Sequence, residues 1–372
     1  MIFQSFIALL GITFSISYQS FAYPVQASRW IHSESKQVFK VISDRHSSDS
    51  SVEPAFLKYC IELRKAKGHG VFLVEGTPQN YRNSAELTRF KELGQQLRIP
   101  LPIYSIIEFA DKLRSSFGSD HQLNRLFDHR NLTLSTLEII SSQRQMNRSF
   151  VFAKAQLAKQ PAIDFKSEIK VSTIFSEVKS IQDKAREANK RLKNHQAAGF
   201  ILEDINQIED NFEVIKENTA PHQLNLDVAK YLDEIRGNSE LINRLQVLCI
   251  EIADPMMLIE AATAIEAGIE ETIFLGGYHH ADKVSEFIGF VNFQLEEKIQ
   301  TEDRSSLRLE AVAGVLQACD KCDQCNDYFA QVKCCAGCKL AKYCSQDCQK
   351  KAWLSHKAPC KEIQAKKKDD SL

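Results

Sequence analysis

The chain has 372 residues, of which 44% are hydrophobic and 26% charged, and its formal net charge is −1. This length predicts two or three domains, and the apolar fraction is sufficient for a buried core. A charge so close to zero excludes recruitment to an anionic polymer or a membrane surface by the field of the whole chain.

The first residues predict a secretory signal peptide. An apolar run covers residues 6–16, and Ser20-Phe21-Ala22 resembles the small-x-small sequence of a cleavage site. The run is too short to span a bilayer comfortably, so no transmembrane anchor is expected once residues 1–22 are removed. Because no Lys or Arg precedes the run, a buried strand or helix is the alternative.

Between about residue 29 and residue 300, short apolar runs alternate with amphipathic segments. The pattern predicts strands at 38–42, 71–74, 101–104 and 272–275 and helices near 54–66, 84–97 and 282–296. Such alternation is typical of an α/β body with parallel strands.

Helical spacing replaces this alternation from about residue 165 to residue 235, which predicts an α-helical insertion in the α/β body. Farther along, Pro255 predicts a helix break near Ala253, and Gly268 predicts a helix end. The chain contains no phosphate-binding G-x-x-x-x-G-K-[ST] loop, dinucleotide-binding G-x-G-x-x-G turn or G-x-S-x-G nucleophile elbow.

Three of the predicted strands end in residues with suitable chemistry for a site. These residues are Asp44-Arg45-His46, Glu75, and Gly276-Gly277-Tyr278-His279-His280. Open α/β sheets bind ligands beyond the carboxyl ends of their strands. His46, Glu75 and His279 or His280 could therefore hold a divalent metal with an open position for water, and Arg45 could clamp an anionic substrate. Alternatively, the glycines only end a strand, the histidines cap the next helix and Glu75 pairs with a nearby base.

The same three motifs resemble those of the TraB-like and erythromycin-esterase-like group. The resemblance implies a metal-dependent hydrolase of an ester or amide bond, in which His46, Glu75, His279 and His280 surround an additional divalent metal. The chain has Ser43-Asp44-Arg45-His46 where that group usually has Gly-Thr-x-His, so the first motif departs from the pattern.

The C-terminal part contains nine of the eleven cysteines, between Cys319 and Cys360. Eight residues there form four closely spaced pairs: Cys322 with Cys325, Cys335 with Cys338, Cys344 with Cys348, and His356 with Cys360. Two tetrahedral zinc sites need eight ligands, so the segment predicts two structural Zn²⁺ ions with no open position. A disulfide framework is the alternative, but it has no use for the histidine. Cys319 and Cys334 are expected to be free thiols, and spacing alone does not separate interleaved from sequential pairing.

The sequence around the later pairs resembles a MYND-type zinc finger, which would cover residues 319–360. The residues that carry the resemblance are Tyr343-Cys344-Ser345-Gln346-Asp347-Cys348-Gln349, Trp353, His356 and Cys360. It implies interleaved pairing, with Cys322, Cys325, Cys344 and Cys348 on one zinc ion and Cys335, Cys338, His356 and Cys360 on the other.

The resemblance also implies protein–protein interaction through a groove for short proline-containing peptides. Gln349 and Trp353 would line this groove on one face of a helix predicted for 345–355. The alternative is that Trp353 only covers the second zinc site. An interaction protein and a metal-dependent hydrolase with a targeting finger therefore both remain as hypotheses.

Lysines make this end of the chain basic, but aspartates are interspersed and the ligand spacing is not that of a single-zinc ββα finger. We therefore expect a solvated lysine face rather than a nucleic-acid interface. Residues 361–372 are expected to form a frayed, disordered tail. Zinc-binding thiolates imply a reducing compartment at the site of action, such as the cytosol of the cell or of a host cell, which contrasts with the predicted signal peptide.

Overall fold

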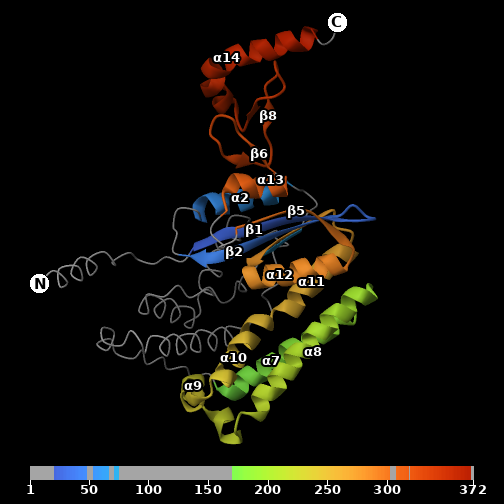
Figure 1. Ribbon diagram of the computed structural model, residues 1–372, viewed down its shortest axis with the longest axis vertical. Helices are drawn as coiled ribbons and strands as arrows, with labels where there is room; N and C mark the ends of the chain where they lie inside the picture. The colour runs from blue at the N-terminus through green and yellow to red at the C-terminus, as the bar shows by residue number, and fades with distance from the viewer. Residues whose placement is uncertain are drawn as a thin grey trace, which may run out of the picture.

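The computed structural model describes residues 21–47, 53–66, 71–74, 170–301, 307–317 and 319–369. The apolar run at 6–16, the helix predicted near 84–97 and the strand predicted at 101–104 lie outside these residues. The described part contains a mixed sheet, an arm of helices that extends away from the sheet, and a cysteine-rich C-terminal module on the opposite side (Figure 1).

The sheet has five strands in the order β3-β4-β2-β1-β5. Their bounds are Phe21–His32 for β1, Val38–Ser47 for β2, Val71–Val74 for β3, Glu271–Gly277 for β4 and Phe293–Gln300 for β5. Strands β2 and β3 pair parallel to β4, whereas β1 pairs antiparallel to both β2 and β5. The register places Asp44 opposite Gly277 and Val74 opposite Leu275, so the carboxyl ends of three neighbouring strands meet at one edge.

Helices cover both faces of the sheet (Figure 1). Helices α2 (Glu53–Ala66) and α13 (Leu309–Leu316) lie on one face, and α11 (Asp254–Glu266) and α12 (Tyr278–Phe290) lie on the other. Each face of the sheet packs against helices to form a hydrophobic core, and side chains alternate along β4 between the two cores. Phe274 packs with α11 and α12, whereas Ile273 and Leu275 pack with α2 and α13. The core on the side of α2 and α13 includes Ala27 of β1 and residues of α13 up to Leu316, so it extends beyond residues 29–300.

The helical arm follows β3 in the described sequence. It contains α7 (Val171–Asn189), α8 (His195–Glu217), α9 (Val228–Glu234) and α10 (Ser239–Glu251). Asn194, Asp227 and Asn238 begin helices α8, α9 and α10 by accepting hydrogen bonds from backbone N–H groups of the first turn. Far from the sheet, these helices share a core of their own that includes Phe212, Tyr231 and Leu245.

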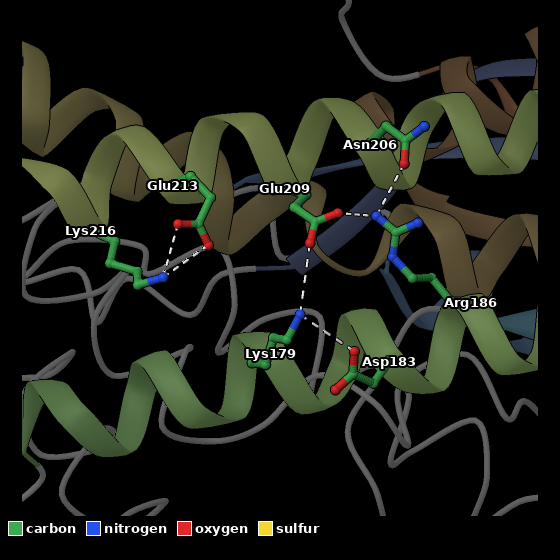
Figure 2. Close-up of polar contacts among 7 residues, drawn as sticks. All are labelled: Lys179, Asp183, Arg186, Asn206, Glu209, Glu213 and Lys216. Carbon is green, nitrogen blue, oxygen red and sulfur yellow. Dashed lines mark hydrogen bonds and ion pairs between the residues drawn. The ribbon is translucent and has the colours of Figure 1, made fainter.

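Polar contacts also connect α7 to α8 (Figure 2). The carboxylate of Glu209 lies between Lys179, at 3.7 Å, and Arg186, whose guanidinium also donates to Asn206 Oδ1 at 3.0 Å. Lys216 pairs within α8 with Glu213 at 2.9 Å. Because Glu209 contacts cations from the facing helix, its interactions fix the relative register of the two helices, whereas the Glu213 pair supports α8 alone.

Several sequence expectations differ from the structure. A helix was expected over 282–296, but α12 ends at Phe290 and residues 293–300 form β5 on the edge of the sheet. Asn292 takes a left-handed conformation with φ of 68° and turns the chain between the two elements. Strand β1 was not predicted at all. The expected break before Pro255 is present, since α10 ends at Glu251 and α11 begins at Asp254.

The C-terminal module consists of two short hairpins and one helix. The hairpins are β6 (Asp320–Lys321) with β7 (Tyr328–Phe329) and β8 (Lys333–Cys334) with β9 (Lys342–Tyr343), and the helix is α14 (Gln346–Asp369). The expectation of a frayed tail from residue 361 was wrong as far as Asp369, because α14 continues to that residue. Within the described residues, no helix combines the length and apolarity needed to cross a membrane.

Candidate functional site

Two similar turns present the first four predicted ligands, which are Cys322, Cys325, Cys335 and Cys338. In the first turn, Cys322 N–H donates to Asp327 O at 2.9 Å, and Asn326 N–H donates to Cys322 O at 2.9 Å. In the second, Cys335 N–H donates to Ala341 O at 2.8 Å, and Lys339 N–H donates to Cys335 O at 2.9 Å. Asn326 and Lys339 both have φ of 62°, so each turn reverses at a left-handed residue four positions after its first cysteine.

The eight predicted ligands form two groups of four in space. One group contains Cys322, Cys325, Cys344 and Cys348, and the other contains Cys335, Cys338, His356 and Cys360. Within each group the ligand atoms all lie within 4.8 Å of one another, and each group could hold a metal ion. The grouping is interleaved along the chain, as the resemblance to a MYND-type finger implies.

The distances within the groups fit zinc better than they fit disulfides. Sulfur atoms lie 3.9 Å apart between Cys325 and Cys344, 3.4 Å between Cys344 and Cys348, and 3.8 Å between Cys335 and Cys360. A tetrahedral ion with Zn–S bonds of about 2.3 Å separates its sulfurs by about 3.8 Å, whereas a disulfide bond measures about 2.05 Å. Cys338 Sγ lies 3.5 Å from His356 Nε2, close to the separation of about 3.6 Å expected for mixed sulfur and nitrogen ligands.

Backbone N–H groups lower the pKa of Cys322 in the first group and of Cys335 and Cys338 in the second, which favours their thiolate forms. Burial raises the pKa of Cys322, but backbone donors from Cys325, Cys344 and Gln324 outweigh it and lower the pKa to about 6. Backbone N–H donation from Cys338 is the largest influence on Cys335, whose pKa is also lowered to about 6. Thiolate is the form that binds zinc, so the turns prepare both groups for metal.

The remaining cysteines have different surroundings. None of the eleven cysteines, all of which the structure describes, forms a disulfide bond. Cys319 packs against the core beneath α2, and burial raises its pKa to about 12. Cys334 is exposed, while Cys60 and Cys249 are buried. None of these four belongs to either metal-binding group.

The first hairpin joins the module to the body of the protein. The rings of Tyr328 and Tyr59 pack edge to face with 5.4 Å between their centroids, and Lys58 Nζ lies 2.6 Å from Asp327 Oδ2. Ala330 N–H also donates to the Glu62 carboxylate at 3.1 Å. The module therefore packs on α2, and α14 lies at the end of the module farthest from the sheet (Figure 1).

Trp353 lies beside the second group of ligands without being buried by it. Its ring lies edge-on to the His356 ring, with 6.2 Å between the ring centroids, yet 42% of the residue is exposed. Gln349 lies one turn earlier and is half-buried. The tryptophan therefore covers part of the second site and at the same time offers apolar surface to solvent.

The second predicted site lies at the edge where β2, β3 and β4 end. Here the structure describes His279 and His280, whereas it does not describe the side chains of Arg45 and His46, and Glu75 lies outside the described residues. His280 is buried, and its Nδ1 lies 2.6 Å from Asp254 Oδ1. His279 Nε2 lies 3.7 Å from Asp254 Oδ2 and 4.0 Å from Glu251 Oε1.

Sequence reasoning missed Asp254, Glu251 and the ion pair between Asp204 and Lys283, whose atoms are 2.7 Å apart. Burial raises the pKa of Glu251, and it raises the pKa of Asp204 to about 6 although Lys283 lowers it. The sequence contains one signal that could have drawn attention to Asp254, because Asp254-Pro255 is typical of the start of a helix. Among the described residues, only the two groups in the C-terminal module bring three or more ligands close enough for a metal.

Comparisons with known proteins identify the C-terminal module. Residues 319–360 match the family model described as MYND finger. Over 51 residues, the chain is 41% identical to SET domain and MYND-type zinc finger protein 6 of Schizosaccharomyces pombe. Over 42 residues it is 45% identical to SET domain-containing protein 14 of Caenorhabditis elegans, and over 40 residues it is 50% identical to histone-lysine N-methyltransferase SMYD3 of Homo sapiens.

These similarities are confined to a small part of each protein. They cover 14%, 11% and 11% of this chain and 11%, 10% and 9% of the three relatives in the same order. The chain thus spans about a tenth of the length of each curated relative. No solved structure matches the chain.

Proposed function

We propose that the C-terminal MYND finger, which the chain carries at residues 319–360, docks a short segment of a partner protein through Gln349 and Trp353. MYND fingers are commonly protein-interaction modules. Each of the two metal groups supplies four protein ligands, which leaves no position for water or substrate on a tetrahedral zinc ion. The finger therefore acts through its surface rather than through chemistry at the metal.

The exposure of Trp353 is the observation that carries this proposal. A tryptophan that only covered a zinc site would be expected to bury most of its ring, yet this residue is 42% exposed. Gln349 precedes it by one helical turn on α14, so the two residues offer a flat apolar ring beside an amide group. Aromatic surfaces of this kind bind proline-containing extended peptides, because the peptide enters with little loss of entropy.

Replacing Trp353 tests the proposal. We expect Trp353→Ala to weaken binding of a proline-containing peptide by about tenfold or more, because an aromatic anchor of an interface contributes about 2 kcal/mol. Fluorescence anisotropy of a labelled peptide measures the affinity, and elemental analysis measures zinc. The variant should keep both zinc ions.

The matched control is Leu295→Ala, since Leu295 has a similar exposure of 47% but lies on β5 in the body. It should leave the peptide affinity unchanged. Loss of zinc together with loss of binding in Trp353→Ala would instead identify the tryptophan as a cover of the second site.

A second candidate function is hydrolysis by a metal-dependent site in residues 29–300, with the finger as a targeting module. The observation that favours it is the register of β2 and β3 with β4, which aligns their carboxyl ends where His279 and His280 begin α12. A metal bound by His46, Glu75 and His279 or His280 would supply a nucleophilic hydroxide from bound water. Asp254 would orient His280, as second partners of metal-binding histidines do.

Metal content separates the second candidate from the first. The hydrolase hypothesis predicts one divalent ion per chain beyond the two of the finger, and His279→Ala should remove that ion because it deletes a proposed ligand. His279 is half-exposed and lies outside the core, so its replacement should leave the fold intact. Glu286, an exposed residue farther along α12, offers the control Glu286→Ala. A content of two ions in the unmodified chain would exclude this candidate.

The domain organisation belongs to the same proposal. We infer an α/β domain with a helical insertion at about 165–235, followed by the finger. The parallel pairing of β2, β3 and β4 and the separate core of the helical arm support it. We also infer that the finger acts in a reducing compartment, because zinc binding requires its cysteine ligands in the reduced thiolate form.

A further inference from the structure

A column of lysines runs along α14 beside Trp353. Lys350, Lys357 and Lys361 follow the spacing i, i+7 and i+11, which places them along one side of a helix. All three are exposed, and within the described part of the chain no ion pair involves them. Ala352 and Cys360, which occupy other positions around the helix, are buried. The column therefore faces away from the core of the finger.

Apolar side chains flank this column on both sides. Trp353 lies toward the second metal group, and Leu354 lies on the other side of the column with 92% of its surface exposed. A leucine this exposed on a helix that lies at the outer end of the finger has no partner within the described structure to cover it (Figure 1). The surface thus combines three unpaired positive charges with two apolar contacts.

The composition of this surface favours an acidic protein segment over a nucleic acid. Residues 319–372 contain no arginine, the side chain that makes bidentate contacts with phosphates and guanine. Asp347 also lies at the start of α14, where it would repel a continuous phosphate backbone. Leu354 would gain little from phosphates, whereas an apolar side chain of a peptide would bury it.

We propose that the segment docked by the finger is acidic: an apolar, proline-containing core whose flanking aspartates or glutamates pair with Lys350, Lys357 and Lys361. This inference rests on the proposed docking function and adds the chemical class of the partner. Trp353 and Leu354 contact the apolar core, and the lysine column selects the charge. Because the column is exposed, its contribution depends on ionic strength.

Peptides that differ only in their flanking residues test the inference. Fluorescence anisotropy with the zinc-loaded full chain would compare one proline-containing core flanked by Asp and Glu, by Asn and Gln, or by Lys. We expect the acidic peptide to bind about tenfold more tightly than the amide-flanked peptide at low salt, because each of two or three exposed ion pairs tightens binding roughly two- to threefold. The difference should largely disappear at about 0.5 M salt.

Charge reversal locates the preference on α14. Lys350→Glu combined with Lys357→Glu should abolish the tenfold difference while the zinc content is unchanged. The control is Lys333→Glu combined with Lys339→Glu, which makes the same change of net charge at exposed positions in and after β8. The control should keep the preference for the acidic peptide.

The other possible outcomes distinguish the docking function from the acidic preference. If Trp353→Ala weakens all peptides but reversal on α14 leaves their ranking unchanged, the docking function stands and the acidic partner is excluded. If both double variants abolish the preference, it reflects net charge rather than the α14 surface, and the inference fails. Stronger competition by a single-stranded oligonucleotide than by the acidic peptide would assign the column to nucleic acid. If no peptide binds the chain, both proposals fail.

Discussion

Asp204 is a carboxyl group whose protonation depends on its place in the fold. The residue is 7% exposed on α8, and Lys283 from α12 reaches one of its oxygens. Burial raises the pKa of Asp204 from 3.8 to about 6, although the lysine lowers it. Between about pH 4 and pH 6 the folded protein therefore keeps a proton that the unfolded chain releases. This contribution to stability is complete below about pH 4 and is lost as the pH rises through about 6.

Replacing Asp204 by asparagine should remove this pH dependence. From about pH 4 to pH 7, we expect the free energy of unfolding of the unmodified chain to fall by roughly 2 kcal/mol relative to that of Asp204→Asn. Urea denaturation across this range measures it. Asp210→Asn removes an exposed carboxyl group from the same helix and should follow the unmodified chain. Parallel curves for Asp204→Asn and the unmodified chain would contradict the prediction.

Residues that act with near neighbours in sequence were predictable, and residues that act across elements were not. Cys322 and Cys325, or His356 and Cys360, reveal themselves because one turn of chain must bring both atoms to one ion. Asp254 and His280 are 26 positions apart and meet because α11 and α12 begin side by side. No local feature of the sequence predicts that contact.

At the scale of the element, strands with both faces buried or one edge exposed were the difficult cases. β1 carries polar Gln26 and Ser28 that are buried together with Val25 and Ala27, so it lacks the alternation that marks a strand. β5 contains Glu296, Glu297 and Lys298, which favour a helix by propensity. Pairing with β1 overrides that propensity, and the charges suit an exposed edge strand.

Helix ends were more predictable than strands because the signals are local. α11 begins at Asp254 with a proline in its first turn, and Gly268, with φ of 69°, follows its end. The same logic failed for α14, where lysine-rich sequence after Cys360 indicated a tail. The lysines, glutamate, glutamine and alanine there are good helix formers, so they continue the helix that begins at Gln346.

At the scale of the whole molecule, the finger is held to the body by side-chain and backbone contacts as well as by the covalent chain. Tyr328, Asp327 and Ala330 of the first hairpin contact Tyr59, Lys58 and Glu62 of α2, respectively. Cys322 and Cys325 lie in the turn that connects the two strands of this hairpin, so metal binding and contact with α2 involve one segment. The finger and α2 are therefore expected to lose order together.

Cys344→Ser tests this coupling. Serine is a poor zinc ligand, so the variant should lose the ion of the first group and loosen the first hairpin. We expect hydrogen exchange in α2 to accelerate by about tenfold, while α8 keeps its protection. Mass spectrometry of deuterated peptides measures both, and Cys334→Ser is the control because Cys334 is exposed and outside both groups. Unchanged exchange in α2 of the variant would mean that the finger folds independently of the body.

By itself, the sequence determined the cysteine-rich finger and the eight residues that form its two possible zinc sites, because metal ligands are set by spacing over a few turns of chain. It also indicated a body of alternating strands and helices. Only the tertiary structure decided the interleaved grouping of the ligands, the place of β1 in the middle of the sheet and the contact of the finger with α2. These features depend on which distant surfaces bury each other, and that information is shared among segments rather than carried by any one of them.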